Sequence, residues 1–354
     1  MTIEWLAGNR IRGTTAERPA LGLPSGSVGG WVELGRTTLG SDGDSIDVTG
    51  LADKRYLMAL INVPTTGNAR PRTRFNADTT NNYSDRWSHI GGTDDTTGTS
   101  KSFIYNEVTS TTDDTFAVCY ASNLSNKEKL TISHGVSAKS AGASQEPFRS
   151  EVVGKWANTS DAISQWNLTN DLAGSYASGS EVVVLGWSPE DTHTDNFFEE
   201  LASVNATSGD NLSSGTILAK KYLWVQAWVK YTGAGGTLEE TFNNDTGSNY
   251  SSRDSYNGGT DGLSTSASNI DWDRGVTDNY YFVNQFIINN SANEKLCIGH
   301  QNRIDVTGAG NTPIRSERVD KWANTSAQIT EIDFDNSLGG IDISNAYLKV
   351  WGSN

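Results

Sequence analysis

The stretch Lys155-Trp-Ala-Asn-Thr-Ser160 returns 166 positions later as Lys321-Trp-Ala-Asn-Thr-Ser326. Two further segments return at the same spacing. Lys54-Arg-Tyr-Leu57 matches Lys220-Lys-Tyr-Leu223, and Glu128-Lys-Leu130 matches Glu294-Lys-Leu296. Between them, Phe75-Asn-Ala-Asp-Thr79 matches Phe242-Asn-Asn-Asp-Thr246. Self-similarity at a fixed period is the signature of a duplicated structural unit. We therefore interpret the chain as two tandem copies of one domain.

The repeats divide the 354 residues into four parts. We expect an N-terminal arm at residues 1–29, one copy at 30–187, a short polar linker at 188–196 and the second copy at 197–354. Each copy is long enough to bury a core without disulfides. The two cysteines, Cys119 and Cys297, occupy different places in the two copies. They are therefore interpreted as plain buried thiols, rather than as a disulfide or a metal cluster.

Each copy contains short segments of alternating apolar and polar residues, bounded by Gly, Asn and Asp, and no convincing helical period. Such a pattern predicts strands joined by turns. About nine strands are expected in the first copy, at 31–39, 55–63, 70–75, 103–108, 115–122, 129–136, 148–156, 162–168 and 181–187. The predicted fold class is all-β, with two tandem jelly-roll-like β-sandwich domains that arose by internal duplication.

Composition excludes several classes of function. The formal net charge is −15 and the pI is near 4.7, so the surface repels nucleic-acid phosphates and anionic membranes. The longest apolar runs, such as 56–61 and 182–185, are strand-length, far below the roughly 20 residues of a membrane span. The first residues lack the basic region and long apolar run of a secretory signal. We expect neither nucleic-acid binding nor membrane insertion.

The end of the first copy carries a recognisable pattern: Trp156, Asn158-Thr159, Ile163, Trp166 and Leu168, then Ser178-Gly-Ser180 and Val182-Val-Val-Leu-Gly186. It resembles the C-terminal end of β-sandwich domains in tailed-phage virion proteins. The segments 3–14 and 30–35 resemble structural proteins of phages or other marine viruses. The resemblance implies a capsid, decoration, fibre or tail component located in the virion. Its implied partners are other copies of itself and other virion proteins.

The second copy ends differently, because Ile341-Asp-Ile-Ser-Asn-Ala346 replaces the Gly-Ser turn. The two copies therefore need not share one role.

The Asn- and Asp-rich loop that occurs in both copies could bind calcium, since hard cations prefer clustered carboxylate and amide oxygens. The candidate ligands are Asn76, Asp78, Asn243 and Asp245. The alternative is that these side chains cap turns through hydrogen bonds to the backbone. We favour turn capping, because no bidentate Glu follows at the spacing of a calcium loop. No other cofactor is expected.

Trp156 and Trp322 could form a platform on which a sugar ring or a partner side chain stacks. The alternative, which we favour, is that each indole pins two sheets together within a core. The pairs Arg149/Glu151 and Arg315/Glu317 are expected to lie on one strand face and to pair with neighbours.

The N-terminal arm combines apolar residues with arginines, in particular Ile3, Trp5, Leu6, Arg10 and Arg12. A terminus of this length has no core of its own and is often disordered. Its apolar residues favour docking on a neighbouring subunit by strand addition. These five residues are therefore candidate assembly residues.

His134 and His300 are equivalent, and each lacks a nearby nucleophile motif or a second histidine at metal spacing. We interpret them as structural and expect no catalytic residues. The favoured function is a non-enzymatic virion structural protein. Alternatives are a carbohydrate- or receptor-binding module, a double jelly-roll capsid protein and, last, a polysaccharide hydrolase, for which no carboxylate pair stands out.

Overall fold

The computed structural model describes residues 30–92, 95–107, 113–189, 191, 196–232, 237–272, 280–304, 308–336 and 342–354. Within these ranges the chain forms 24 strands in four antiparallel sheets and no helix. The predicted all-β fold class is therefore confirmed. The described ranges also contain no helix that is long and apolar enough to span a bilayer.

The first repeat is built from twelve strands in two sheets. The eight-stranded sheet has the order β1-β12-β3-β8-β9-β10-β5-β6, and the four-stranded sheet has the order β2-β11-β4-β7. Its strands are β1 (Val32–Thr38), β2 (Ser45–Thr49), β3 (Tyr56–Val63), β4 (Arg72–Phe75), β5 (Tyr83–His89), β6 (Thr96–Lys101), β7 (Ile104–Tyr105), β8 (Thr115–Ser122), β9 (Lys129–Ser137), β10 (Phe148–Trp156), β11 (Gln165–Thr169) and β12 (Glu181–Trp187).

The second repeat reproduces this topology strand for strand. Its sheets have the orders β13-β24-β15-β20-β21-β22-β17-β18 and β14-β23-β16-β19, so each strand number is raised by twelve. Its strands are β13 (Glu199–Ala206), β14 (Asn211–Ser213), β15 (Tyr222–Tyr231), β16 (Leu238–Phe242), β17 (Tyr250–Tyr256), β18 (Gly262–Ala267), β19 (Ile270–Asp271), β20 (Tyr280–Ile288), β21 (Lys295–Ile304), β22 (Ile314–Trp322), β23 (Ile332–Asn336) and β24 (Ile343–Ser353).

Each repeat has its own core between its two sheets. Inward-facing side chains such as Leu57, Ala59 and Ile61 of β3 are fully buried against the four-stranded sheet of the first repeat. The equivalent strand β15 contributes Leu223, Val225 and Ala227 to the second core. Because side chains alternate across a strand, one face of each eight-stranded sheet is left for other contacts.

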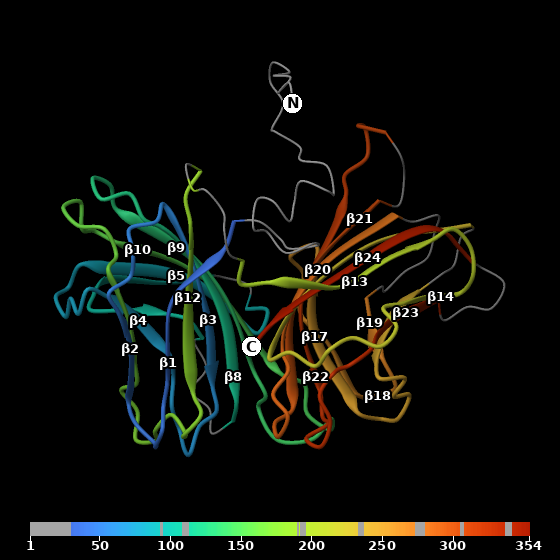
Figure 1. The fold of residues 1–354 in the computed structure, drawn as a ribbon, viewed down its shortest axis with the longest axis horizontal. Helices are drawn as coiled ribbons and strands as arrows, with labels where there is room; N and C mark the ends of the chain where they lie inside the picture. Colours follow the sequence, from blue (N-terminus) through green and yellow to red (C-terminus); the bar gives the residue numbers. More distant parts are fainter. Residues whose placement is uncertain are drawn as a thin grey trace, which may run out of the picture.

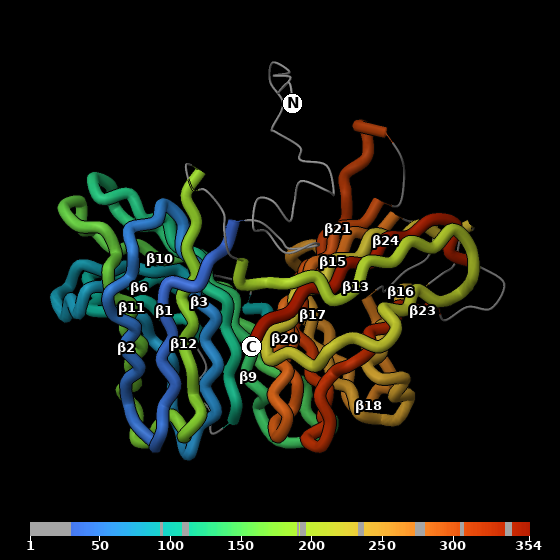
Figure 2. The backbone as a smooth tube through the Cα atoms, in the orientation of Figure 1, coloured from blue at the N-terminus to red at the C-terminus, as the bar shows by residue number. Residues whose placement is uncertain are grey.

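Parts of those remaining faces meet each other. Figures 1 and 2 show the blue-to-green first repeat and the yellow-to-red second repeat side by side, with the C-terminus at their junction. There the backbone oxygen of Asn354 accepts a hydrogen bond from Arg36 of β1. A third apolar core lies between the repeats. The two repeats therefore pack directly against each other and are not joined by the linker alone.

Candidate functional site

The junction between the repeats is apolar. The first repeat contributes a surface that we call the B face, formed by Met58, Leu60, Phe116, Val118, Val136, Ala138, Val183 and Leu185. The second repeat contributes a surface that we call the A face, formed by Tyr222, Phe286, Ile288, Leu296, Ile298 and Val319. Burying one such side chain stabilises by about 1.5–3 kcal/mol, so together they hold the repeats in one orientation.

Charged groups at the edge of the junction fix this orientation further. Arg149 of β10 donates to Asp261 at 2.8 Å, and both side chains are at most 5% exposed. Arg253 of β17 donates to Glu146 at 2.8 Å and to the backbone oxygen of Pro147. Burial alone would lower the pKa of Arg149, but the neighbouring carboxylates outweigh burial and raise it. These pairs satisfy charges that burial would otherwise leave uncompensated.

Hydrogen bonds to backbone and side-chain oxygens also join the two repeats. The Lys321 ammonium group is fully buried and donates to the backbone oxygens of Ala138, at 3.0 Å, and Ser140, at 2.6 Å. Glu181 accepts hydrogen bonds from Lys221 and from the Tyr222 hydroxyl group across the junction. The junction is thus an apolar centre with a hydrogen-bonded rim, which is the usual anatomy of a stable interface.

The equivalent histidines meet in this junction. The rings of His134 and His300 lie 4.4 Å apart. Burial lowers the pKa of His134 to about 3, with smaller effects from His300 and Arg149. Burial also lowers the pKa of His300. Both imidazoles are therefore neutral at pH 7 and pack against each other in the junction.

The first repeat carries its own copy of the A face, and this copy is exposed. Tyr56, Leu130, Ile132 and Val153 are 40%, 58%, 51% and 48% exposed. Their equivalents, Tyr222, Leu296, Ile298 and Val319, are at most 3% exposed because the first repeat covers them. Identical residue types therefore have opposite environments in the two repeats.

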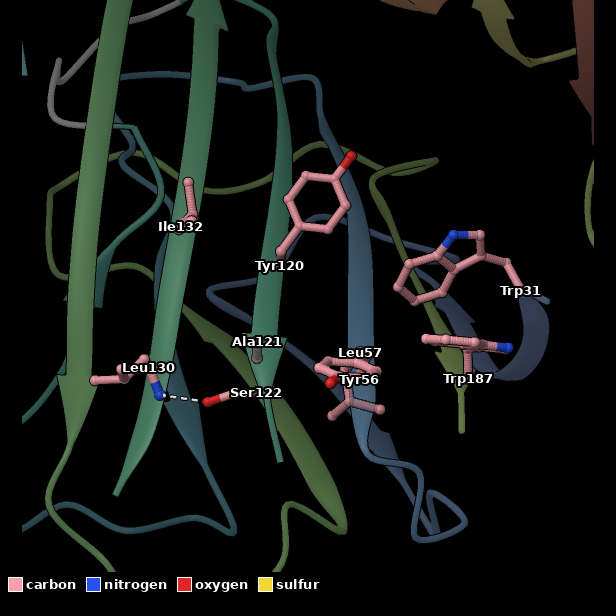
Figure 3. A pocket seen from close by; sticks show the side chains of 9 residues that line it. All are labelled: Trp31, Tyr56, Leu57, Tyr120, Ala121, Ser122, Leu130, Ile132 and Trp187. Atoms are coloured by element: carbon pink, nitrogen blue, oxygen red, sulfur yellow. Dashed lines mark hydrogen bonds between the residues drawn. The ribbon is translucent and has the colours of Figure 1, made fainter. Parts of the chain in front are cut away.

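Two adjoining hollows lie over the exposed A face. One, of about 360 Å³, is lined mainly by Trp31, Tyr56, Tyr120, Leu130, Ile132 and Trp187 (Figure 3). The Tyr56 and Trp187 rings stack with centroids 5.4 Å apart. The only serine in the lining, Ser122, already accepts a hydrogen bond from the Leu130 backbone N–H (Figure 3). The second hollow shares Leu130 and Ile132 and extends to Val153 and Lys155.

The structure places the two predicted tryptophans in the cores. Trp156 and Trp322 are each 1% exposed, so neither ring face can contact a ligand. The alternative that they form a stacking platform is therefore wrong. The Trp156 Nε1 donates to the Asp78 carboxylate at 2.8 Å, and Trp322 donates to Asp245 at 2.7 Å. Each indole instead packs in the core between the two sheets of its repeat, as the favoured interpretation predicted.

The Asn and Asp loop residues have turn-forming roles. The Asn76 side-chain oxygen accepts from the backbone N–H groups of Ser164 and Gln165, whereas Asp78 accepts from the backbone N–H of Thr80. Asn243 and Asp245 repeat this arrangement with Thr330 and Gly247.

The Asn and Asp oxygens of each loop thus face separate sets of donors instead of converging on one point. Burial alone would raise the pKa of Asp78, but the hydrogen bonds that it accepts outweigh burial and lower it to about 2. Among the described residues, no cluster of three or more His, Cys, Asp or Glu side chains could hold a metal ion.

The candidate assembly residues Ile3, Trp5, Leu6, Arg10 and Arg12 lie outside the described residues. Cys119 and Cys297 are buried and free, as predicted. The paired charges of β10 and β22 also follow the prediction, with Arg149 to Glu151 at 2.5 Å and Arg315 to Glu317 at 2.7 Å.

The exposed A face was not predicted from the sequence. The sequence did contain an indication of this face, because the same residue types as Tyr56, Leu130 and Ile132 occur at the equivalent positions of the second repeat. All three point away from the core of their own repeat, and retention of apolar residues at such positions indicates a contact surface.

The fold and the junction define a protein with two rigidly joined β-sandwiches. No family model matches the chain, and no curated protein matches it either. Among solved structures, domains LG4-5 of the mouse laminin alpha1 chain align at 11% identity, with a TM-score of 0.19, over 91% of this chain and 88% of the laminin chain. Neisserial surface protein A aligns at 8% identity, with a TM-score of 0.12, over 79% of this chain and 96% of its own.

Proposed function

We propose that this chain is a non-enzymatic structural protein of a virus particle, in which the two sandwiches act as one rigid building unit. The observation that carries this proposal is the apolar core between the repeats, where the A face of the second repeat is buried against the B face of the first. A protein that works by filling space and making contacts needs a fixed shape, and this core supplies it.

Location in a virion is supported by the sequence. The arm and the closing strand pattern of the first repeat resemble tailed-phage and marine-virus structural proteins. A net charge of −15 suits a unit that must stay soluble at the high local concentration of an assembly. Capsid, decoration and fibre positions are all compatible with a rigid sandwich pair.

The test is to detect the chain in purified particles. Antibodies raised against the recombinant protein should label intact particles from the source culture, and mass spectrometry of density-banded particles should recover its peptides at constant stoichiometry. Recovery only from the cell fraction, with none in banded particles, would reject the virion role.

Glycan or receptor binding is a second candidate, favoured by the aromatic hollow on the first repeat. Trp31, Tyr56, Tyr120 and Trp187 present ring faces and polar tips in one place (Figure 3), and stacking on aromatic rings is a common way to bind sugars. Binding on a glycan array should then disappear in Trp187→Ala. An exposed control outside the hollow, Leu263→Ala, should bind normally.

A hydrolase has less support. Two carboxyl groups that lie within the sandwich cores, Glu107 and Glu240, are fully buried. Burial raises the pKa of Glu240 to about 8. Neither group can contact a polysaccharide chain without opening a core.

A further inference from the structure

The molecule contains four related surfaces, of which two are already paired. The A face of the second repeat covers the B face of the first. The A face of the first repeat and the B face of the second have no counterpart within the described residues. The second B face consists of the positions equivalent to the first, including Phe282 and Ile304, and we include Tyr347, the equivalent of the junction residue Glu181.

The free A face retains both the apolar and the charged groups of the paired A face. Tyr, Leu, Ile and Val recur at the four equivalent positions described above. Lys155 and Arg86 are the equivalents of Lys321 and Arg253, which bind the first repeat across the junction. In the first repeat these two cations are 43% and 57% exposed. The free A face therefore keeps most of the groups by which an A face recognises a B face, with Ser122 in place of Ile288.

The free B face exposes apolar side chains where the paired B face makes its contacts. Phe282, Ile304 and Tyr347 are 45%, 40% and 47% exposed. Their equivalents in the first repeat are Phe116, Ala138 and Glu181, all of which contact the second repeat. Of the eleven large hydrophobic side chains that are exposed among the described residues, seven lie on the two free faces. Such clustering is typical of an interaction surface.

We infer that the A face of the first repeat packs on the B face of the second repeat of another copy of this chain, reproducing the internal junction between molecules. The contact is heterologous, because two different surfaces meet. Successive copies therefore form either a closed ring or an open filament, according to the rotation that the junction imposes. Self-association of this kind adds to the proposed structural function. It rests on that function only for the biological purpose of the assembly.

The intermolecular contact is weaker than the internal one. Four apolar residues of the paired B face, Leu60, Val118, Val136 and Val183, are replaced in the free B face by Gln226, Asn284, Asn302 and Lys349. Burying these polar groups offsets part of the gain from the exposed aromatic rings. Assembly is consequently reversible and depends on protein concentration.

The test uses the full chain and two variants that each disable one face. Ile132→Lys places a charge on the free A face, and Phe282→Lys places a charge on the free B face. In sedimentation equilibrium, the wild-type mass should rise with concentration above the monomer mass of 38.2 kDa. Each variant alone should remain a monomer, because it retains only one functional face.

An equimolar mixture of the two variants should form a 1:1 dimer and nothing larger, since one intact A face meets one intact B face. Leu218→Lys, a control at a 70% exposed side chain between β14 and β15, should associate like the wild type. Circular dichroism should show that every variant is folded. If Ile132→Lys is not folded, Val153→Lys is used in its place.

Three results would overturn the inference. The first is a wild type that stays monomeric at all concentrations. The second is association that persists in Phe282→Lys alone, which would indicate a dimer of two A faces. The third is association that depends only on residues 1–29. None of these results bears on whether the chain is found in virions. Equally, absence from particles leaves the association in solution unaffected, so the two proposals fail separately.

Discussion

Arg149 of the first repeat and Asp261 of the second form an ion pair at 2.8 Å within the junction, with side chains 5% and 3% exposed. The Arg149 equivalent, Arg315, is 62% exposed. One duplicated arginine thus joins the repeats while the other lies at the surface.

Replacing Arg149 by Ala should lower the free energy of unfolding by about 3 kcal/mol, because it leaves the buried Asp261 carboxylate without its closest cation. Arg315→Ala is the matched control and should change the stability by less than about 1 kcal/mol. Urea unfolding followed by tryptophan fluorescence measures both. Equal losses in the two variants would show that the junction pair does not hold the repeats together.

Phe116→Ala should destabilise the junction. Its side chain is 1% exposed and packs near the Tyr222 ring of the second repeat, so truncation leaves a cavity and costs about 3 kcal/mol. The equivalent Phe282→Ala removes an exposed ring and should cost well under about 1 kcal/mol. Thermal unfolding of the two variants gives the comparison, and similar melting temperatures would contradict the proposed role of the junction.

Trp156→Phe keeps an aromatic ring in the first core but removes the hydrogen bond to Asp78. Because this bond has a charged acceptor, its loss should cost about 1.5–3 kcal/mol. The double variant with Asp78→Ala should be less destabilised than the sum of the two single changes, because each change removes the same bond. Strict additivity would show that the two residues act independently.

Glu240 should make stability fall as the pH rises. Burial raises its pKa to about 8 in the folded protein, against about 4.3 for an unperturbed glutamate. Between these values the folded state holds a proton that the unfolded state has lost. The group's stabilising effect is therefore complete below the unfolded pKa and is lost as the pH rises through about 8.

Glu240→Gln should flatten this dependence, since an amide cannot ionise. Glu199→Gln, a control at a side chain that is 51% exposed, should retain the wild-type profile. Urea midpoints measured from pH 5 to pH 9 provide the data. An unchanged slope in Glu240→Gln would show that the carboxyl group does not titrate in this range.

Most of the strands could be predicted, because period-two alternation marks them in the sequence. Three strands of the first repeat were missed, namely β2, β5 and β6. Strand β5 lies within the eight-stranded sheet. Its inward-facing Asp85 is buried and bonds the Lys101 ammonium at 2.5 Å. A carboxylate at an inward position breaks the apolar alternation. The groups that offset the cost of its burial, the Lys101 ammonium and the Tyr105 backbone N–H, lie sixteen and twenty residues later.

The sequence by itself determined the duplication, the all-β class and the turn-forming role of the Asn and Asp loops, because each depends on local spacing and on side chains near in the chain. Only the tertiary structure decided that Ile298 is covered and Ile132 is not. On its own strand face each isoleucine has a leucine two residues before it and a histidine two residues after it. Burial of an outward face depends on which distant surface packs on it, and the first repeat presents its B face to only one of the two A faces.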